Sequence, residues 1–363
     1  MIYLDYQATT PLAPEAKSAM LPWLDSFANP HSSHRAGRAA KAAVEAARER
    51  VAALLPPGGR TVFTSGATEA LNWAIKGAPP GDIVTIATEH AAVLDTVEAL
   101  SWAGRQVTIL PVDGDGLVDR QAALGAIVPG VSLVAAMLVN NEIGVIQPIG
   151  WLADLAHAAG ALLLCDAVQG YGRIEIPKSC DMVAISAHKI DGPKGIGALW
   201  LRDGTPPIAP LLHGGGQEPG RSGTLSPMLC AGFGAAAAIA GERRDVDGAH
   251  VATLFDRLRS ALPGWTLNGT ADARYRGNLN LRRDGLDAGR LISELREIAL
   301  SAGSACASGS GRPSHVLRAI GLSDAEARSS IRLGFGRYTT IAEIDTAAAA
   351  IRAAADRQRI LAA

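Results

Sequence analysis

The chain has 363 residues, of which 48% are apolar and 19% charged, and its 34 Lys and Arg nearly balance its 35 Asp and Glu. A formal net charge of −1 argues against a nucleic-acid partner, and this apolar content excludes a disordered chain. No apolar run approaches the ~20 residues that a bilayer-spanning helix needs, so we expect no membrane partner. The N-terminus lacks a secretory signal, and we expect a cytoplasmic protein of about two domains.

Short apolar strands alternate with Ala-rich helices from about residue 34 to residue 240, a pattern typical of a doubly wound, mostly parallel α/β sheet. We expect strands at 61–64, 82–87, 106–112, 132–139, 161–165, 182–186 and 196–201, and helices at 35–55, 68–76, 93–103 and 149–159. After about residue 245 the pattern indicates a smaller α+β domain. Its predicted elements are helices at 250–262, 288–297 and 314–320, strands at 278–282 and 330–334, and a last helix that opens with a capping-box spacing at 340–343.

Four cysteines stand at widely spaced positions, without a C-x-x-C pair or paired histidines nearby. This spacing argues against a zinc site and a disulfide framework, so we predict no resident metal. Cys165, Cys180 and Cys230 are interpreted as small buried apolar residues. Cys306 differs, because 11 of the 15 residues in 301–315 are Ser, Ala or Gly, a composition typical of an accessible loop.

Ligands of open α/β sheets bind outside the carboxyl ends of the strands, so the residues that follow each predicted strand are candidates for chemistry. The turn at 65–69 joins a strand to a helix and offers backbone N–H groups and hydroxyls to a phosphate. Taken alone, an ordinary helix cap is the better interpretation of this turn. The chain has no Walker A loop, and the glycines at 232–237 do not follow a clear strand, so neither predicts a nucleotide site.

Two further strand ends carry residues that could bind a ligand or react with it. Asp166 ends a buried apolar strand, where a carboxylate needs a cationic or donating partner, and Ser186, His188 and Lys189 end the next strand. Pyridoxal 5′-phosphate requires a lysine for its aldehyde, a carboxylate for its protonated ring nitrogen and a phosphate-binding turn. Each residue has an ordinary structural explanation by itself, but their conjunction predicts this cofactor.

At this point the sequence resembles the pyridoxal-phosphate-dependent cysteine desulfurases of the class V aminotransferase family. Ten motifs carry the resemblance in order: YLDYQATTP at 3–11, NPHSSH at 29–34, TSGATE at 64–69, TEH at 88–90, VNNEIG at 139–144, CDAVQ at 165–169, SAHK at 186–189, RSGTL at 221–225, GSAC at 303–306 and SIR at 330–332. They cover the chain nearly end to end. The resemblance implies the type I fold of pyridoxal-phosphate enzymes, with a large domain over 12–245 and a small domain formed by 1–11 and 246–363.

The resemblance also implies a role for each matching residue. Lys189 would carry the cofactor, Asp166 would pair with its ring nitrogen, Gln169 would bond its ring hydroxyl, and His90 would stack on the ring and act as acid and base. The phosphate would be held by Ala67, Thr68, Ser186 and His188, with Thr224 reaching it from the neighbouring subunit of a homodimer. Asn141, also part of the cofactor site, and Arg332 would bind the substrate carboxylate.

Cys306 decides the reaction that the resemblance implies. L-cysteine becomes L-alanine, and its sulfur moves to Cys306 as a persulfide, for delivery to a scaffold protein of iron–sulfur cluster assembly or to another acceptor. The only metal contact expected is a transient one between Cys306 and such a cluster. Without Cys306 the same site would serve a selenocysteine lyase or a class V aminotransferase, whereas a non-catalytic sulfur carrier would not need Lys189. Gln7 departs from the family, whose members often carry a smaller residue there.

Overall fold

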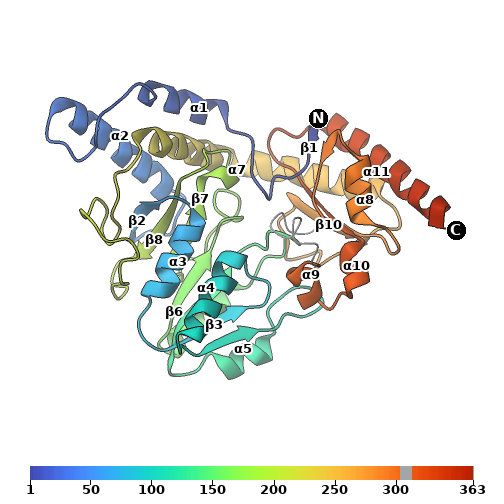
Figure 1. Cartoon of the computed structure of the whole chain (residues 1–363), viewed down its shortest axis with the longest axis horizontal. Helices are drawn as coiled ribbons and strands as arrows, with labels where there is room; N and C mark the ends of the chain where they lie inside the picture. The colour runs from blue at the N-terminus through green and yellow to red at the C-terminus, as the bar shows by residue number, and fades with distance from the viewer. Residues whose placement is uncertain (303–312, 363) are drawn as a thin grey trace.

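The computed structural model describes residues 1–302 and 313–362, which form a large sheet-centred part and a smaller part joined by a long helix (Figure 1). Seven strands make the main sheet in the order β2-β8-β7-β6-β5-β3-β4. Their bounds are β2 Gly59–Thr64, β3 Asp82–Ile86, β4 Val107–Leu110, β5 Val131–Met137, β6 Leu162–Asp166, β7 Met182–Ser186 and β8 Gly197–Arg202. The strands β3 to β7 run parallel, whereas β8 is antiparallel to β7 and β2. The predicted mostly parallel sheet is confirmed.

Helices cover both faces of this sheet. On one face lie α3 (Ala67–Gly77) and α4 (Ala91–Trp102), and on the other lie α2 (Arg35–Ala52), α6 (Ile149–Ala158) and the first half of α7 (Pro227–Ala261). The neighbouring strand residues Leu163 and Leu164 are both fully buried, and each joins a different one of the two cores. Burial on both faces explains why these strands are continuously apolar rather than alternating. The remaining helical elements of this part are α1 (Pro14–Met20), the 3-10 helices η1 (Leu21–Trp23) and η2 (Ala187–Lys189), and α5 (Arg120–Ala126).

The smaller part has a three-stranded antiparallel sheet in the order β12-β10-β9. Its strands are β9 (Thr266–Leu267), β10 (Asn278–Arg282) and β12 (Ser330–Gly334), and its helices are α8 (Ala288–Glu294), α9 (His315–Ala319), α10 (Asp324–Arg328) and α11 (Ile341–Ala362). The N-terminal strand β1 (Ile2–Tyr3) pairs with β11 (Ile298–Ala299), and Leu4 is buried in the core of this part. The capping box before α11 is confirmed, because Glu343 N–H donates to Thr340 Oγ1 at 3.2 Å and Thr340 N–H donates to Glu343 Oε2 at 2.8 Å.

The predicted helix at 250–262 exists, but its predicted first residue is wrong. That segment is the second half of α7, a single helix of 35 residues. Its first half is buried and Ala-rich all round, so it lacks the apolar periodicity by which sequence analysis recognises helices. The predicted domain boundary at 245 falls inside α7, and the division into two domains there remains a proposal.

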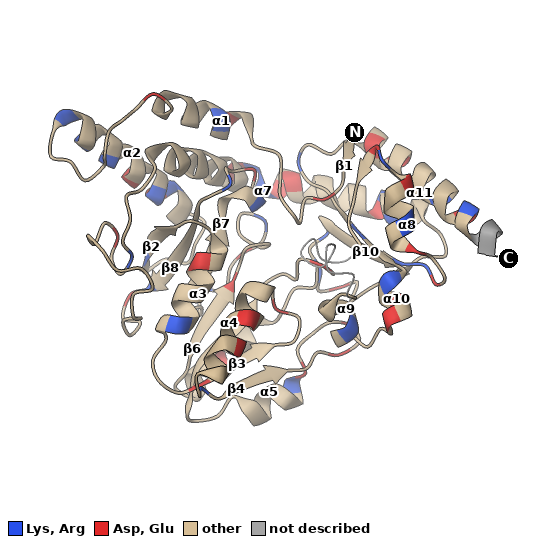
Figure 2. Ribbon diagram, viewed as in Figure 1, with Lys and Arg blue, Asp and Glu red and all other residues tan. Residues whose placement is uncertain are grey.

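Lys, Arg, Asp and Glu residues are dispersed along the helices and loops of both parts (Figure 2). Within residues 1–302 and 313–362, no helix combines the length and apolar content required to traverse a membrane. In the same residues, no group of three or more His, Cys, Asp or Glu is arranged to hold a metal ion.

Candidate active site

A cavity of about 990 Å³ lies at the carboxyl ends of the parallel strands of the main sheet. The predicted site residues that line it are Ala67, Thr68, His90, Asn141, Asp166, Gln169, Ser186, His188, Lys189 and Arg332. The small part contributes Arg332, on β12, to this cavity. The other residues follow or end strands of the main sheet or begin α3. Thr224 is exposed and does not line this cavity in its own chain, and Cys306 lies outside the described residues.

The turn before α3 lies at the cavity, with the first residues of that helix. Gly66, the N-cap residue of α3, provides no side-chain cap for the first N–H groups of the helix. Ser65 N–H donates instead to Glu69 Oε2 at 2.7 Å, and Glu69 is paired with Arg221 at 2.8 Å. The N–H groups at the start of a helix carry partial positive charge, so this turn suits an anion such as a phosphate group.

Asp166, the last residue of β6, is a buried carboxylate at the cavity. It is 6% exposed, and among the described residues it accepts one hydrogen bond, from Val168 N–H at 3.0 Å, and forms no ion pair. Burial raises the pKa of Asp166, while this hydrogen bond and the nearby His90 and Lys189 lower it. A carboxylate in this position fits the protonated ring nitrogen of pyridoxal phosphate, which would supply the missing positive charge.

Lys189 lies directly after β7 on the short helix η2, and its amine is held by backbone acceptors. Its Nζ donates to the main-chain oxygens of Gln7 and Ala8, the latter at 2.9 Å. Burial, together with the positive charges of Arg332 and Arg173, lowers the pKa of Lys189 to about 8. An amine with this pKa is partly neutral near pH 7, which is the form that attacks an aldehyde.

Gln169 is oriented by partners on both sides of its amide. Its Nε2 donates to the main-chain oxygen of Gln7 at 3.0 Å, and its Oε1 accepts from Arg173 Nη1 at 3.0 Å. Arg173 also donates to the main-chain oxygen of Lys189. Arg173 therefore links two of the residues that sequence analysis assigned to the cofactor, although the sequence pattern gave it no role.

His90 is the N-cap residue of α4 and lines the cavity. Its Nδ1 accepts a hydrogen bond from Ala92 N–H at 3.0 Å, which leaves Nε2 as the ring nitrogen available to a ligand. Burial lowers the pKa of His90, while Asp166 raises it and Lys189 lowers it. The imidazole is therefore neutral near pH 7, with its proton on Nε2.

Arg332 is 1% exposed and held by three partners. Its Nη2 donates to Asp5 Oδ1 at 2.7 Å and to Ser301 Oγ at 2.9 Å, and its Nη1 donates to the main-chain oxygen of Asn141 at 3.1 Å. The Nε–H group is buried and has no acceptor among the described residues. A buried, unpaired guanidinium donor beside a cavity fits a ligand carboxylate.

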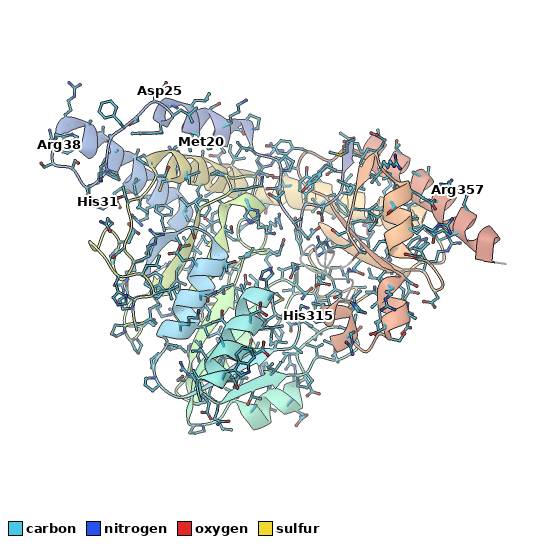
Figure 3. All side chains as sticks on the ribbon, in the orientation of Figure 1. Met20, Asp25, His31, Arg38, His315 and Arg357 are labelled. Carbon is cyan, nitrogen blue, oxygen red and sulfur yellow. The ribbon has the colours of Figure 1, made fainter. Side chains whose placement is uncertain are left out.

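The sequence-based assignments missed Glu142 and His315, which line the cavity, and the buried Glu89, which precedes His90. Glu142 Oε2 accepts from Ser314 Oγ at 2.5 Å, and His315, the first residue of α9 (labelled in Figure 3), is bonded through Nε2 to the main-chain oxygen of Glu89 at 2.9 Å. Burial raises the pKa of Glu89 and of Glu142. Both follow buried strands, so the argument applied to Asp166 would have found them.

The three cysteines that the structure describes are buried, as the sequence analysis predicted. Cys165, Cys180 and Cys230 are buried and unpaired, and burial raises the pKa of Cys230 to about 12, which keeps it a neutral thiol. These three residues are therefore inert, and the candidate for sulfur chemistry among the four is Cys306.

Comparison with known proteins agrees with this geometry. The family model described as aminotransferase class-V matches residues 2–346. The chain is 44% identical over 378 residues to the cysteine desulfurase IscS of Rickettsia akari, covering 99% of this chain and 92% of the relative. It is 45% identical to the enzyme of the same name from Rickettsia bellii, covering 95% and 89%.

Two solved structures resemble this chain in fold over nearly its whole length. A NifS-like protein from Rickettsia africae superimposes with a TM-score of 0.90 at 30% identity, covering 98% of this chain and 99% of the other. A structure described as SspA in complex with cysteine has a TM-score of 0.83 at 36% identity, covering 94% and 100%.

Proposed function

The chain belongs to the class V aminotransferase family and is a pyridoxal-phosphate-dependent cysteine desulfurase, and we propose that the residues around its central cavity divide the reaction between them as follows. L-cysteine and the Cys306 thiol are converted to L-alanine and a Cys306 persulfide. The observation that carries this proposal is that Lys189, Asp166 and the uncapped start of α3 line one cavity, as an amine, a carboxylate and an anion site.

Lys189, Asp166 and Gln169 would hold the cofactor's aldehyde, ring nitrogen and ring hydroxyl, and His90 would stack on its ring. Ala67, Thr68, Ser186 and His188 would hold its phosphate. Burial lowers the pKa of His188 to about 4, so this imidazole is neutral and offers one N–H as a donor. When bound, pyridoxal phosphate supplies an electron sink for negative charge that develops on the substrate.

The substrate would be placed by its carboxylate, which takes the unpaired Nε–H of Arg332, with the amide of Asn141 beside it. Lys189, with its amine free, would remove the α-proton of the bound substrate. Its low pKa makes the neutral amine available near pH 7 and lets it accept this proton.

Sulfur transfer requires a thiolate, and we assign it to Cys306. The Cys306 sulfur bonds to the substrate sulfur while the carbon–sulfur bond breaks, and the electron pair of that bond stays with the carbon. A proton then completes the methyl group of L-alanine. The Cys306 thiol supplies this proton, and the proton held by Lys189 returns to the α-carbon. The Nε2–H of His90, which has no partner among the described residues, would donate a hydrogen bond to the Cys306 thiolate.

Mass spectrometry after brief exposure to L-cysteine tests this assignment. We expect one additional sulfur atom on the peptide that contains Cys306, and none on the peptides of the three buried cysteines. Cys306→Ser should bind the cofactor with the same visible absorbance but gain no sulfur. Undiminished sulfide production by that variant would refute the role of Cys306.

The active unit in this proposal is a homodimer. Thr224 is exposed rather than placed at the cavity of its own chain, and the segment between α1 and α2 exposes Leu21, Leu24 and Phe27, with Phe27 97% exposed. A second copy would cover these apolar side chains and bring its Thr224 to the phosphate.

Subunit complementation tests this arrangement. Lys189→Ala alone should be inactive, and Thr224→Asp should be weakened, because a carboxylate repels the phosphate. Co-expression would restore activity, since one site of the mixed dimer receives an intact Lys189 and an intact Thr224. Activity that never exceeds the mean of the two variants would contradict a shared site.

The persulfide would pass its sulfur to an acceptor or scaffold protein, including one of iron–sulfur cluster assembly. A cytoplasmic location belongs to this proposal, because a catalytic thiol must remain reduced between turnovers. Fractionation of the host cell, with the desulfurase activity recovered outside the soluble cytoplasmic fraction, would contradict it.

A further inference from the structure

Gln7, which the sequence analysis noted as larger than the residue that family members often carry there, lies where the two parts of the molecule meet. The N-terminal segment crosses from β1, beside the small part, to α1 above the large sheet (Figure 1). Gln7 is 3% exposed on this crossing.

The main-chain oxygen of Gln7 contacts two residues assigned to the cofactor. It accepts from Lys189 Nζ and from Gln169 Nε2, the latter at 3.0 Å. Any displacement of this carbonyl therefore moves the acceptor that orients both the amine of Lys189 and the amide of Gln169.

The side chain of Gln7 anchors that carbonyl to the small part. Its Nε2 donates to the main-chain oxygen of Gly277 at 2.8 Å, immediately before β10. Its Oε1 is buried and has no hydrogen-bond partner within 1–302 and 313–362. The opposite amide orientation would point Oε1 at the Gly277 oxygen, so the observed orientation is the favourable one.

Gly334, the last residue of β12, provides the space for this side chain. A Cβ atom on Gly334 would lie 1.6 Å from Gln7 Oε1 and 2.6 Å from Gln7 Cδ. Gly334 does not adopt a positive φ, so its backbone conformation does not require glycine. The side chain of Gln7 is the principal obstacle, and the main-chain nitrogen of Tyr6, which would lie 2.9 Å from the same Cβ, is a second and smaller one.

We propose that Gln7 and Gly334 form a matched pair that positions the residue-7 carbonyl, and through it the Lys189 amine and the Gln169 amide. Gln7 is thus a positioning residue for the desulfurase reaction. The inference rests on the proposed role of Lys189. A smaller residue at position 7 is compatible with a larger one at 334, because each fills the space that the other leaves.

A double-mutant cycle tests the pair in the holoenzyme. Gly334→Ala should keep the cofactor, lower kcat by about tenfold or more, and shift the pH midpoint of the cofactor's visible absorbance, because it displaces Gln7. Gln7→Ser should shift the same midpoint and lower kcat less. In the double variant kcat should recover most of the way to the level of Gln7→Ser, because the contact with the Tyr6 main chain remains. Gly150→Ala, whose new Cβ meets no atom within 4 Å, is the matched glycine control and should change neither quantity.

Independent, multiplying effects of the two substitutions would overturn the pair. An unchanged kcat and midpoint in Gln7→Ser would overturn its positioning role and leave only packing. Thermal unfolding and cofactor content are measured for every variant. If Gly334→Ala does not fold, recovery of folding in the double variant supports the pair, and failure to recover overturns it. If another lysine holds the cofactor, chemical labelling of the wild-type enzyme reveals this separately.

Discussion

The burial of the Lys189 amine predicts a pH-dependent cost to the stability of the apoprotein. Its pKa falls from 10.5 in the unfolded chain to about 8 in the folded one, and at ~1.4 kcal/mol per pH unit this amounts to about 3 kcal/mol. The folded state binds this proton less tightly, so the cost is fully present below pH 8. It disappears as the pH rises from 8 towards 10.5.

Lys189→Met removes the charge and keeps a chain of similar length. At pH 7 the apo variant should be more stable than the apo wild type by ~1–2 kcal/mol, because the loss of two hydrogen bonds to the carbonyls of residues 7 and 8 offsets part of the gain. At pH 10 this advantage should shrink by about 2–3 kcal/mol and reverse, since the folded amine is then neutral and the unfolded amine is close to its own pKa, so little of the cost is left.

Urea unfolding of both apoproteins at the two pH values measures this change, and other titrating groups cancel in the comparison. Lys76→Met, on the exposed surface of α3, is the control, and its difference from wild type should be the same at both pH values. An equal stability difference between Lys189→Met and wild type at pH 7 and pH 10 would show that the amine is not desolvated.

Three further outcomes follow from the geometry. Arg332→Lys should raise KM for L-cysteine by about tenfold or more with a smaller effect on kcat, because an ammonium cannot reproduce the guanidinium fork; an unchanged KM in steady-state assays would contradict the carboxylate role. Asp166→Asn should release cofactor during dialysis and lower kcat, since the ring nitrogen loses its counter-charge; full retention and full activity would contradict the pairing. Gly234→Ala should destabilise the fold by ~1–3 kcal/mol in urea unfolding, because the new Cβ would meet Ala47 Cα at 2.7 Å where α7 crosses α2; wild-type stability would show that the helices separate freely.

The local sequence pattern was sufficient to predict the strands that position the site. The strands β7, β10 and β12 match their predicted bounds, because each is a short β-branched or leucine-rich run between turns. The rule that ligands bind at strand ends then placed Asp166 and Lys189 at one cavity, as the structure has them.

Contacts between distant segments were beyond such reasoning. Gln7 reaches Gly277 across 270 residues of sequence, and Arg173 joins Gln169 to Lys189 through a main-chain oxygen that no residue pattern reports. The uninterrupted course of α7 was missed for a different reason, because full burial removes the amphipathic period that marks a helix.

Borohydride reduction of the holoenzyme, followed by proteolysis and mass spectrometry, tests the central claim most directly, since it fixes the cofactor covalently to the amine that carries it. We expect the pyridoxyl label on the peptide that contains Lys189 and its absence from every other lysine peptide. Label on a different lysine, with Lys189 unmodified, would contradict the whole assignment of the site.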